Sequence, residues 1–163
     1  MVFSGQLSVR TEVTPNDCEA VRELVASTGF FHPPEVDVAV ELVEERLAKG
    51  PASGYEFVFL ESGGRLIGYS CFGPIPCTVD SYDLYWIAVH TDHQRHGIGR
   101  RLMEMSEQAV RERAGRRVYV DTSGREQYRS TRSFYERCGY TLEATLRDFY
   151  DEGDDRVIYV RKL

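Results

Sequence analysis

The stretch from Val89 to Met103, VHTDHQRHGIGRRLM, decides how the rest of the chain is interpreted. The run before it, YDLYWIAV (82–89), is rich in aromatic and β-branched residues and predicts a strand. The run after it has apolar residues at helical spacing and predicts a helix. Gly97 and Gly99 therefore lie where a strand gives way to a helix. Glycines at that point let an anionic ligand approach the free amides of the first helical turn.

Basic residues next to these glycines strengthen the prediction of an anion site, because Arg95, Arg100 and Arg101 can add charge-assisted contacts. The competing interpretation is a tight turn followed by a solvated basic helix end. Two familiar phosphate loops do not fit. The sequence has no GxxxxGK[ST] motif, and Leu102 stands where a GxGxxG fingerprint needs its third glycine.

Strand and helix signals alternate along the whole chain. Short β-branched and alternating runs predict seven strands, at 6–13, 55–61, 65–73, 82–89, 116–122, 140–150 and 156–163. Helical spacing and cap signals predict four helices, from Thr14 to about Gly29, from about Pro34 to Lys49, from the glycines to Gly115, and over 128–139. Strand–helix–strand units imply parallel pairing and hairpins imply antiparallel pairing. We therefore expect an α/β fold with a mixed sheet covered by helices.

Composition limits the class of protein. A chain of 163 residues with 42% hydrophobic composition suits one domain over 1–163. The net charge of −6 argues against a general nucleic-acid-binding surface. The sequence has no apolar run long enough for a membrane span or a secretory signal. Its four cysteines form no CxxC pair, so we expect a reducing cytoplasm.

At this point a resemblance becomes specific. The residues QRHGIG, Gln94 to Gly99, match the Q/R-x-x-G-x-G/A signature of the GNAT superfamily of acyl-CoA-dependent N-acetyltransferases. The segment FYERCGY (134–140) resembles that family's "fYeklGF" segment, about 35 residues downstream as in the family. The order of predicted elements is also similar. The resemblance covers nearly the whole chain and implies a GNAT-like fold and acyltransferase activity with acetyl-CoA as cosubstrate.

The resemblance also implies which residues hold acetyl-CoA. The pyrophosphate would meet the glycine loop, and the pantetheine arm would lie along the preceding strand like an added strand. The implied cofactor-binding residues are Ile87, Ala88, Val89, Gln94, Arg95, His96, Gly97, Ile98, Gly99, Arg100, Arg101 and Thr131. The chain departs from the family pattern N-x-x-A-x-x-x-Y, because Tyr128 and Thr131 stand at the asparagine and alanine positions. A hydroxyl of Ser123, Ser130 or Thr131 is a hypothetical substitute for the asparagine.

Acyl transfer needs a neutral amine, yet a lysine-like amine has a pKa of about 10.4. Asp83 is the predicted general base, because it lies six residues before Val89, where many family members place a glutamate. Its side chain is one methylene shorter, so a bridging water is expected. The alternatives are a carboxylate that only binds the acceptor's ammonium and a polar residue at a strand end.

Tyr135 is the predicted acid for the departing thiolate, since it matches the family tyrosine in FYERCGY. The alternative is a core tyrosine, because Thr131, Phe134, Tyr135 and Cys138 form one stripe of the predicted helix. The backbone amide of Val89 is the expected donor to the thioester oxygen.

His90, His93 and His96 occur at three-residue intervals, and three imidazoles can bind zinc. They fall in the strand-to-helix connection, where the backbone is expected to meet pyrophosphate. We therefore predict no metal site.

Two weaker features concern the acceptor. The turn DEGDD, Asp151 to Asp155, is either a solvated hairpin turn or an acidic surface that attracts a cationic amine, and Asp148 and Tyr150 stand just before it. On the resemblance, Phe30, Phe31 and Tyr55 are predicted to form the opposite wall of the acceptor site.

The sequence therefore predicts an N-acetyltransferase that moves an acetyl group from acetyl-CoA directly to a primary amine. A small molecule or amino-acid derivative is the first expectation for the acceptor, with a protein N-terminus or lysine as the alternative. A non-catalytic acyl-CoA-binding regulatory module is the alternative of another class. Neither nucleic acid nor membrane is an expected partner. A homodimer is compatible with the resemblance, because many family members dimerise.

Overall fold

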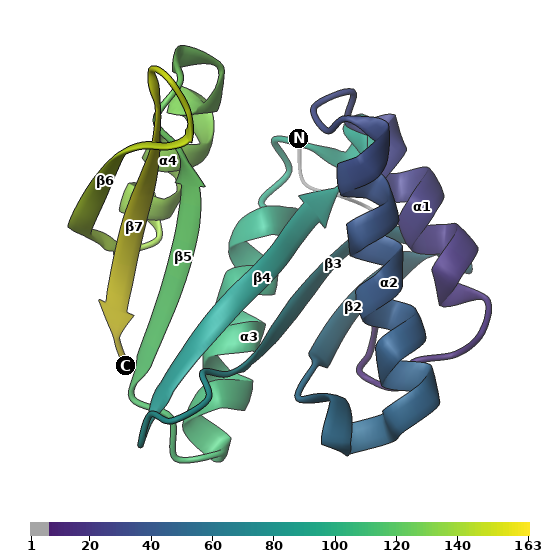
Figure 1. Cartoon of the computed structure of the whole chain (residues 1–163). Helices are drawn as coiled ribbons and strands as arrows, with labels where there is room; N and C mark the ends of the chain where they lie inside the picture. Colours follow the sequence, from purple (N-terminus) through teal and green to yellow (C-terminus); the bar gives the residue numbers. More distant parts are fainter. Residues whose placement is uncertain (1–6) are drawn as a thin grey trace. The chain divides into compact units, whose positions relative to one another are not determined.

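The computed structural model describes residues 7–163, and its elements follow the order predicted from the sequence (Figure 1). The strands are β1 (Leu7–Arg10), β2 (Glu56–Ser62), β3 (Arg65–Pro74), β4 (Ser81–Val89), β5 (Arg117–Ser123), β6 (Thr141–Asp151) and β7 (Asp154–Lys162). The α-helices are α1 (Asp17–Ser27), α2 (Pro33–Lys49), α3 (Ile98–Glu112) and α4 (Arg129–Arg137). Three short 3-10 helices are η1 (Gly50–Ser53), η2 (Thr91–His93) and η3 (Glu126–Tyr128).

The strands form a mixed sheet in the order β1-β2-β3-β4-β5-β7-β6. β4 and β5 are parallel, whereas the pairs β1–β2, β2–β3, β5–β7 and β6–β7 are antiparallel. The parallel pair belongs to the strand–helix–strand unit through α3, and the hairpins supply antiparallel pairs. The predicted α/β fold with a mixed sheet is confirmed.

The chain divides into two compact units, each described here by itself. Within the described residues, unit 1 comprises residues 7–73 and 86–108, and unit 2 comprises residues 74–85 and 109–163. The division falls within β4 and within α3. That residues 1–163 form a single domain stays a prediction.

Unit 1 is built around the hairpin of β2 and β3, with α1 and α2 packed on it. Gly63 and Gly64 both have positive φ, which is the backbone of a two-residue turn between these strands. The apolar residues of both helices meet the strands in one core, made of Val21, Leu24, Val25, Val36, Ala39, Val40, Val43, Phe57, Phe59, Tyr69, Cys71 and Ala88. This core fixes the sheet that carries the end of β4.

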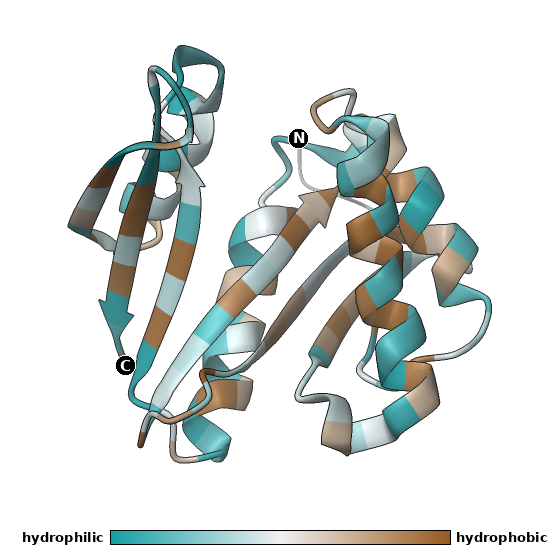
Figure 2. Cartoon of the chain, viewed as in Figure 1, coloured by the Kyte–Doolittle hydropathy of each residue, from teal (hydrophilic) through white to brown (hydrophobic). Residues whose placement is uncertain are grey.

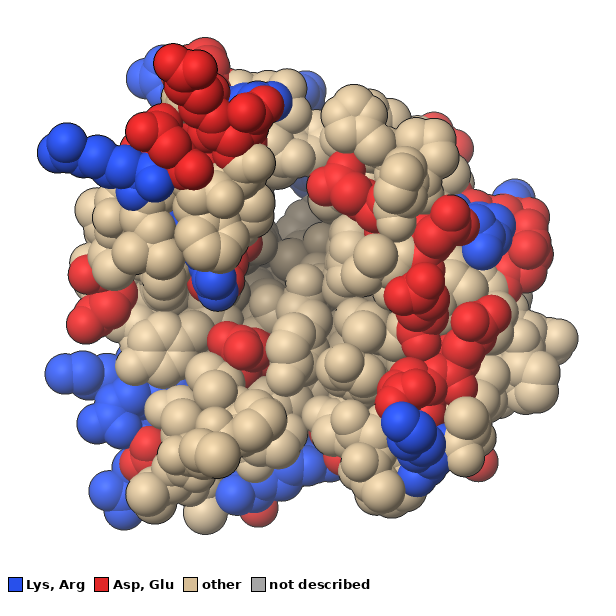
Figure 3. Space-filling model, in the orientation of Figure 1, with Lys and Arg blue, Asp and Glu red and all other residues tan. Residues whose placement is uncertain are grey.

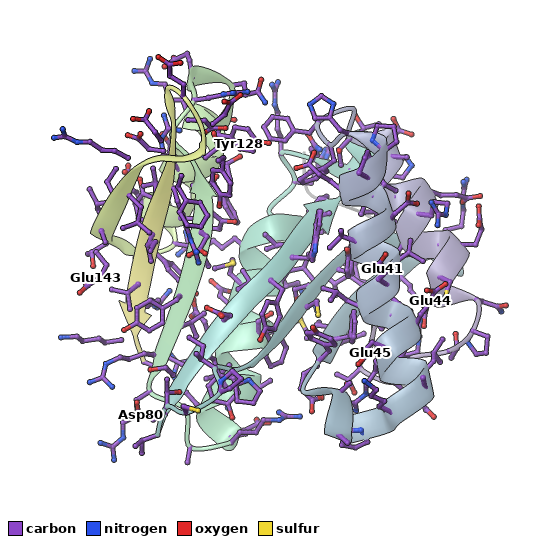
Figure 4. All side chains as sticks on the ribbon, in the orientation of Figure 1. Glu41, Glu44, Glu45, Asp80, Tyr128 and Glu143 are labelled. Atoms are coloured by element: carbon purple, nitrogen blue, oxygen red, sulfur yellow. The ribbon has the colours of Figure 1, made fainter. Side chains whose placement is uncertain are left out.

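The solvent face of α2 is acidic, as Figure 3 shows, and Figure 4 labels its residues Glu41, Glu44 and Glu45. Glu41 and Glu44 are exposed, whereas Val40 and Val43 beside them are buried. The helix is therefore amphipathic, with its apolar side toward the core and its carboxylates toward solvent.

Unit 2 is built on β5, β7 and β6, with α4 behind β5 and β7 in Figure 1. Hydrophobic and hydrophilic residues alternate along β5 and β7 (Figure 2). Val118 and Val120 of β5 are buried, and Tyr119 and Asp121 between them are half-buried. The two faces of this sheet therefore differ, and the more polar face includes Asp121.

Several predicted boundaries were wrong. The first strand ends at Arg10 and not at residue 13, and Gln6 lies outside the described residues. Helix α1 begins at Asp17 and not beside Thr14, after a turn over residues 15 and 16. The Asp17 carboxylate accepts hydrogen bonds from the backbone N–H (2.7 Å) and the hydroxyl (3.1 Å) of Thr14, which holds this turn against the helix. The last hairpin turns at Glu152 and Gly153 alone, so β6 and β7 extend into the acidic segment predicted as turn.

Candidate functional site

The glycine loop lies in unit 1, between the end of β4 and the start of α3. The N–H of His90 bonds to the carbonyl of Ile67 on β3 (2.9 Å), and the Gln94 side-chain amide donates to the carbonyl of Val89 (3.1 Å). Arg95 and Gly97 have φ values of 65° and 79°. These left-handed residues turn the chain sharply into the helix.

The first turn of α3 presents backbone donors. The N–H of Arg101 bonds to the carbonyl of Gly97 (3.0 Å), so the amides of residues 98–100 precede the first bond of the helix. Ile98 is buried and packs closely against Gly68 of β3, where even an added Cβ would lie only 3.0 Å from the Ile98 side chain. This packing anchors the turn. Gln94, Arg95, His96, Gly97, Arg100 and Arg101 are exposed. This part of the site can hold an anion.

Ile87, Ala88 and Val89 end β4, directly before the loop. The pairing of β4 with β5 covers Ser81 to Asp83 only, and the later residues of β4 lie outside it. Their backbone runs in the extended conformation that a strand-like ligand requires.

His90 and His93 have their ring centroids 5.9 Å apart, and the His90 Nδ1 accepts a hydrogen bond from the N–H of Asp92 (3.2 Å). Within residues 7–163, no group of three or more His, Cys, Asp or Glu is arranged to hold a metal ion. His90, His93 and His96, in the connection between β4 and α3, are therefore not arranged as a set of metal ligands.

A charged cluster in unit 2 contains the predicted base. Asp83 of β4 is opposite Tyr119 of β5, and Asp121 lies two residues further along β5 on the same face. Asp121 is opposite Ile158 of β7, whose face also includes Arg156. The Arg156 guanidinium forms an ion pair with the Asp121 carboxylate.

The Asp83 carboxyl group is half-buried, and its pKa is raised to about 6. Loss of solvation is the main cause, and the negative charge of Asp121 adds to it. The positive charge of Arg156 acts in the opposite direction. Asp83 is therefore a carboxylate at neutral pH that binds a proton more readily than an ordinary aspartate.

Arg156 is held on two sides. Its guanidinium carbon lies 4.9 Å from the centroid of the Phe149 ring, and its other contact is the ion pair with Asp121. Its buried Nε has no hydrogen-bond partner in the described part of the chain. Tyr150 is half exposed, and burial followed by the charge of Asp121 raises the pKa of its hydroxyl.

Tyr135, the predicted acid, lies on α4 and is buried. Its ring packs against Phe134, Tyr140 and Tyr159 at centroid distances of 5.6, 6.1 and 6.2 Å. Burial raises the pKa of its hydroxyl well above the ordinary value, so the group keeps its proton. Tyr159 points to the face of β7 opposite to that of Arg156, so Tyr135 and the Asp121–Arg156 pair belong to opposite faces of this sheet.

The family model of the acetyltransferase (GNAT) family matches residues 19–140. The protein belongs to the GNAT acetyltransferase family. It is therefore an acyltransferase, and its glycine loop and its FYERCGY segment are the parts that pointed to this family.

Solved structures agree with this GNAT assignment. A crystal structure from Desulfovibrio desulfuricans, described as an acetyltransferase of the GNAT family, is 47% identical, with a TM-score of 0.95 over 96% of this chain and 99% of that chain. An aminoglycoside 6'-N-acetyltransferase complexed with coenzyme A has 20% identity and a TM-score of 0.77, with 96% of both chains covered. The ribosomal-protein-S18-alanine N-acetyltransferase of Escherichia coli has 18% identity and a TM-score of 0.72, covering 96% and 94%. No match was found among curated proteins.

The residues that depart from the GNAT pattern lie around the start of α4. Tyr128 caps this helix beyond the end of β5 (Figure 4), and Thr131 is half-buried on its first turn. The Ser123 hydroxyl bonds to the carboxylate of Asp154 and accepts a hydrogen bond from the N–H of Arg125 (3.1 Å). Ser123 is thus engaged within the protein, and a cofactor contact by Ser130 or Thr131 stays a prediction.

The acidic turn of this GNAT protein is not merely solvated. Asp154 is buried and pairs with Arg125 (3.2 Å), and the Asp155 carboxylate accepts a hydrogen bond from the N–H of Asp148 (3.0 Å). The Asp148 carboxylate in turn accepts from the N–H of Gly153 (2.7 Å). Much of the local negative charge therefore holds the turn together.

Sequence reasoning missed three residues of this GNAT protein. Asp121 and Arg156 join Asp83 in unit 2, and Trp86 packs against Phe31 in unit 1 at 4.9 Å between ring centroids. Alternation along 116–122 placed Asp121 on the polar face of a strand and was the available signal. The partner of Asp121 lies 35 residues away, so no local pattern identified Arg156. The predicted wall residue Phe31 also contacts Phe30, at 5.7 Å.

Among the helices of residues 7–163, none is both long and apolar enough to span a membrane.

Proposed function

We propose that the protein transfers an acetyl group from acetyl-CoA directly to a primary amine of a small molecule or amino-acid derivative. The observation that carries this proposal is the half-buried Asp83, whose pKa is raised to about 6 and which shares a sheet face with Asp121 and Arg156. A carboxylate of this kind binds an ammonium group and accepts its proton more readily than an ordinary aspartate.

The residues of unit 1 suit an acyl-CoA. The amides at the start of α3 and the exposed side chains of Arg95, Arg100 and Arg101 match a pyrophosphate in charge and hydrogen bonding. The peptide groups of Ile87, Ala88 and Val89 suit the amides of a pantetheine arm. In this assignment Gln94, His96, Gly97, Ile98 and Gly99 shape the loop, and Thr131 replaces the missing asparagine contact.

The proposed chemistry uses one proton acceptor and one proton donor. Asp83 takes a proton from the ammonium group, directly or through a water, and the neutral nitrogen forms the new C–N bond as the thioester C–S bond breaks. The nitrogen then loses its second proton, which returns through water to the oxygen of Tyr135 after that residue has protonated the sulfur. Tyr135 gives its proton to the departing sulfur, which its raised pKa allows because the hydroxyl is protonated at neutral pH.

The acceptor class rests on the position of Asp83. Because this carboxylate is half-buried, a small amine or a flexible chain end reaches it more easily than the surface of a folded protein. The names of similar structures include both an aminoglycoside and a ribosomal-protein acetyltransferase, and at 20% and 18% identity they agree in fold alone. We further propose a cytoplasmic location, which four free cysteines support.

The test combines calorimetry with acetyl-CoA and a thiol-release assay over a panel of diamines, amino-acid amides, aminoglycosides and peptides. We expect micromolar binding of acetyl-CoA and release of thiol with at least one small amine. Asp83→Asn should abolish turnover while acetyl-CoA still binds. Release with peptides alone would favour the protein acetyltransferase, and binding without release from any amine would favour the regulatory module.

A further inference from the structure

Residues 147–150 form a large bulge near the end of β6. The pairing of β6 with β7 stops after Leu146 and resumes at Asp151, and between the partners of these two residues β7 has only Asp155. Asp148 in the bulge has a φ of 50°, and its N–H donates to the Asp155 carboxylate (3.0 Å). Its own carboxylate accepts a hydrogen bond from a backbone N–H of the turn (2.7 Å). The bulge is therefore a structured part of unit 2.

This bulge places two aromatic side chains beside the charged cluster of unit 2. Phe149 and Tyr150 are each 50% exposed, and their rings meet edge to face with centroids 5.1 Å apart. The Phe149 ring lies against the Arg156 guanidinium. Burial raises the pKa of the Tyr150 hydroxyl, and the charges of Asp121 and Arg156 also act on that pKa, so the hydroxyl lies near both residues. We name the side chains of Phe149 and Tyr150 the aromatic ledge.

The charged cluster accommodates one positive charge. The Arg156 guanidinium is bound to the Asp121 carboxylate, whereas Asp83 makes no ion pair in the described part of the chain. At neutral pH the two carboxylates and the guanidinium carry a net charge of −1, which a single ammonium group neutralises. Beside the aromatic ledge, a second ammonium group on the same ligand would meet the Arg156 guanidinium, and like charges repel.

We propose that the acceptor is a monoamine with an apolar body, preferably an aromatic ring, whose nitrogen binds at Asp83 while the ring covers the aromatic ledge. This inference rests on the proposed function and narrows its acceptor class. Exposed aromatic rings gain free energy when apolar surface covers them. β5 and β7 lie between β4 and β6, so the ligand passes Asp121 on its way from Asp83 to the ledge. The Cα atoms of the two aspartates are about 8 Å apart, so a chain of about four carbons brings the ring to the ledge.

Two exposed carboxylates favour the competing class of acceptor, a polyamine. Asp151 and Glu152 are exposed next to the bulge, and acidic side chains attract cations. However, Asp151 lies 3.7 Å from the Arg125 guanidinium, which also binds the carboxylate of Asp154 (3.2 Å). A cationic side chain thus already compensates part of this negative charge. The monoamine is therefore favoured, and a diamine is the comparison that decides between the two classes.

The test compares three amines that share a four-carbon chain. Phenylbutylamine ends in an aromatic ring, butylamine in a methyl group, and diaminobutane in a second ammonium group. Thiol release gives kcat/KM for each amine in the wild type and in Tyr150→Ala, Tyr150→Phe and Leu142→Ala. Leu142 is the matched control, because it is also an exposed apolar side chain of β6 but is opposite Tyr159, on the other face of the sheet. Circular dichroism checks that each variant is folded.

We expect kcat/KM to be roughly tenfold higher for phenylbutylamine than for butylamine, and lowest for diaminobutane. Tyr150→Ala should remove most of this preference, whereas Tyr150→Phe, which keeps the ring, and Leu142→Ala should retain it.

Equal kcat/KM values for phenylbutylamine and butylamine would overturn the inference, as would a highest value for diaminobutane or a preference that survives in Tyr150→Ala. The wider amine panel keeps this result separate from the proposed function. Thiol release with other amines but with none of these three would refute the monoamine class alone. No release with any amine would refute the acetyltransferase reaction and the monoamine class together.

Discussion

The pH dependence of the reaction gives the sharpest test of the charged cluster. Asp83 has a pKa of about 6, raised by burial first and by the carboxylate of Asp121 second. Replacing Asp121 with asparagine removes that negative charge and leaves Arg156 without its anionic partner. Both effects favour the charged form of Asp83, so its pKa should fall. The acid limb of kcat/KM against pH should therefore move to lower pH in Asp121→Asn.

The size of the shift follows from the sheet geometry. Tyr119 of β5 is directly opposite Asp83, and Asp121 lies two residues further along β5. The strand spacing and the rise per residue therefore separate the Cα atoms of the two aspartates by about 8 Å. Two charges at that distance repel by about 2 kcal/mol at an effective dielectric constant of about 20, and by about 0.5 kcal/mol in water. Asp83 is half-buried, so we expect about 1 kcal/mol after screening, which is roughly 0.7 pKa unit.

The assay is thiol release from pH 5 to 9 with the best amine of the panel. Arg156→Gln is the matched variant of opposite sign, because loss of the positive charge should move the acid limb to higher pH. A shift in the same direction in both variants would refute the electrostatic reasoning. A profile without an acid limb near pH 6 in the wild type would refute the assignment of Asp83 as the base.

Three further predictions concern single residues. A raised pKa means that the folded protein binds the Asp83 proton more tightly than the unfolded chain, so stability is lost as the pH rises through about 6. In urea titrations, Asp83→Asn should therefore raise the free energy of unfolding by about 1 kcal/mol at pH 8 after screening. At pH 4 the same variant should hardly change it. Tyr135→Phe should lower kcat by ~10–10⁴-fold and leave acetyl-CoA binding unchanged by calorimetry, whereas an unchanged kcat would make the residue part of the core only. Gly97→Ala and Gly64→Ala each place a Cβ on a residue with positive φ, and at both positions that Cβ has no atom within 4 Å. Both variants should therefore lose a similar conformational free energy, about 1–2 kcal/mol, but only Gly97→Ala should weaken acetyl-CoA binding. Equal binding by the two variants would remove the loop from the cofactor site.

The glycine loop and the order of elements were determined by the sequence alone. Local patterns carried this information, because a β-branched run, two glycines and a helical repeat each depend on neighbouring residues. The same local reasoning placed the start of α1 too early, because residues 15 and 16 form a turn before the helix. It failed again at the acidic turn, where hydrogen bonds from Asp148 and Gly153 let the strands continue into a segment that reads as a loop.

Tertiary structure decided the chemistry around Asp83. The sequence placed this aspartate on a strand, but its ordinary pKa argued against a basic role until burial and the charge of Asp121 were known. Arg156 comes from a strand 35 residues beyond Asp121, and strand pairing alone brings them together. Side-chain identity is fixed by the sequence, whereas solvation and the charges nearby depend on which distant strands become neighbours. The sequence thus determined the family and the loop, and the fold determined how an aspartate becomes suited to accept a proton.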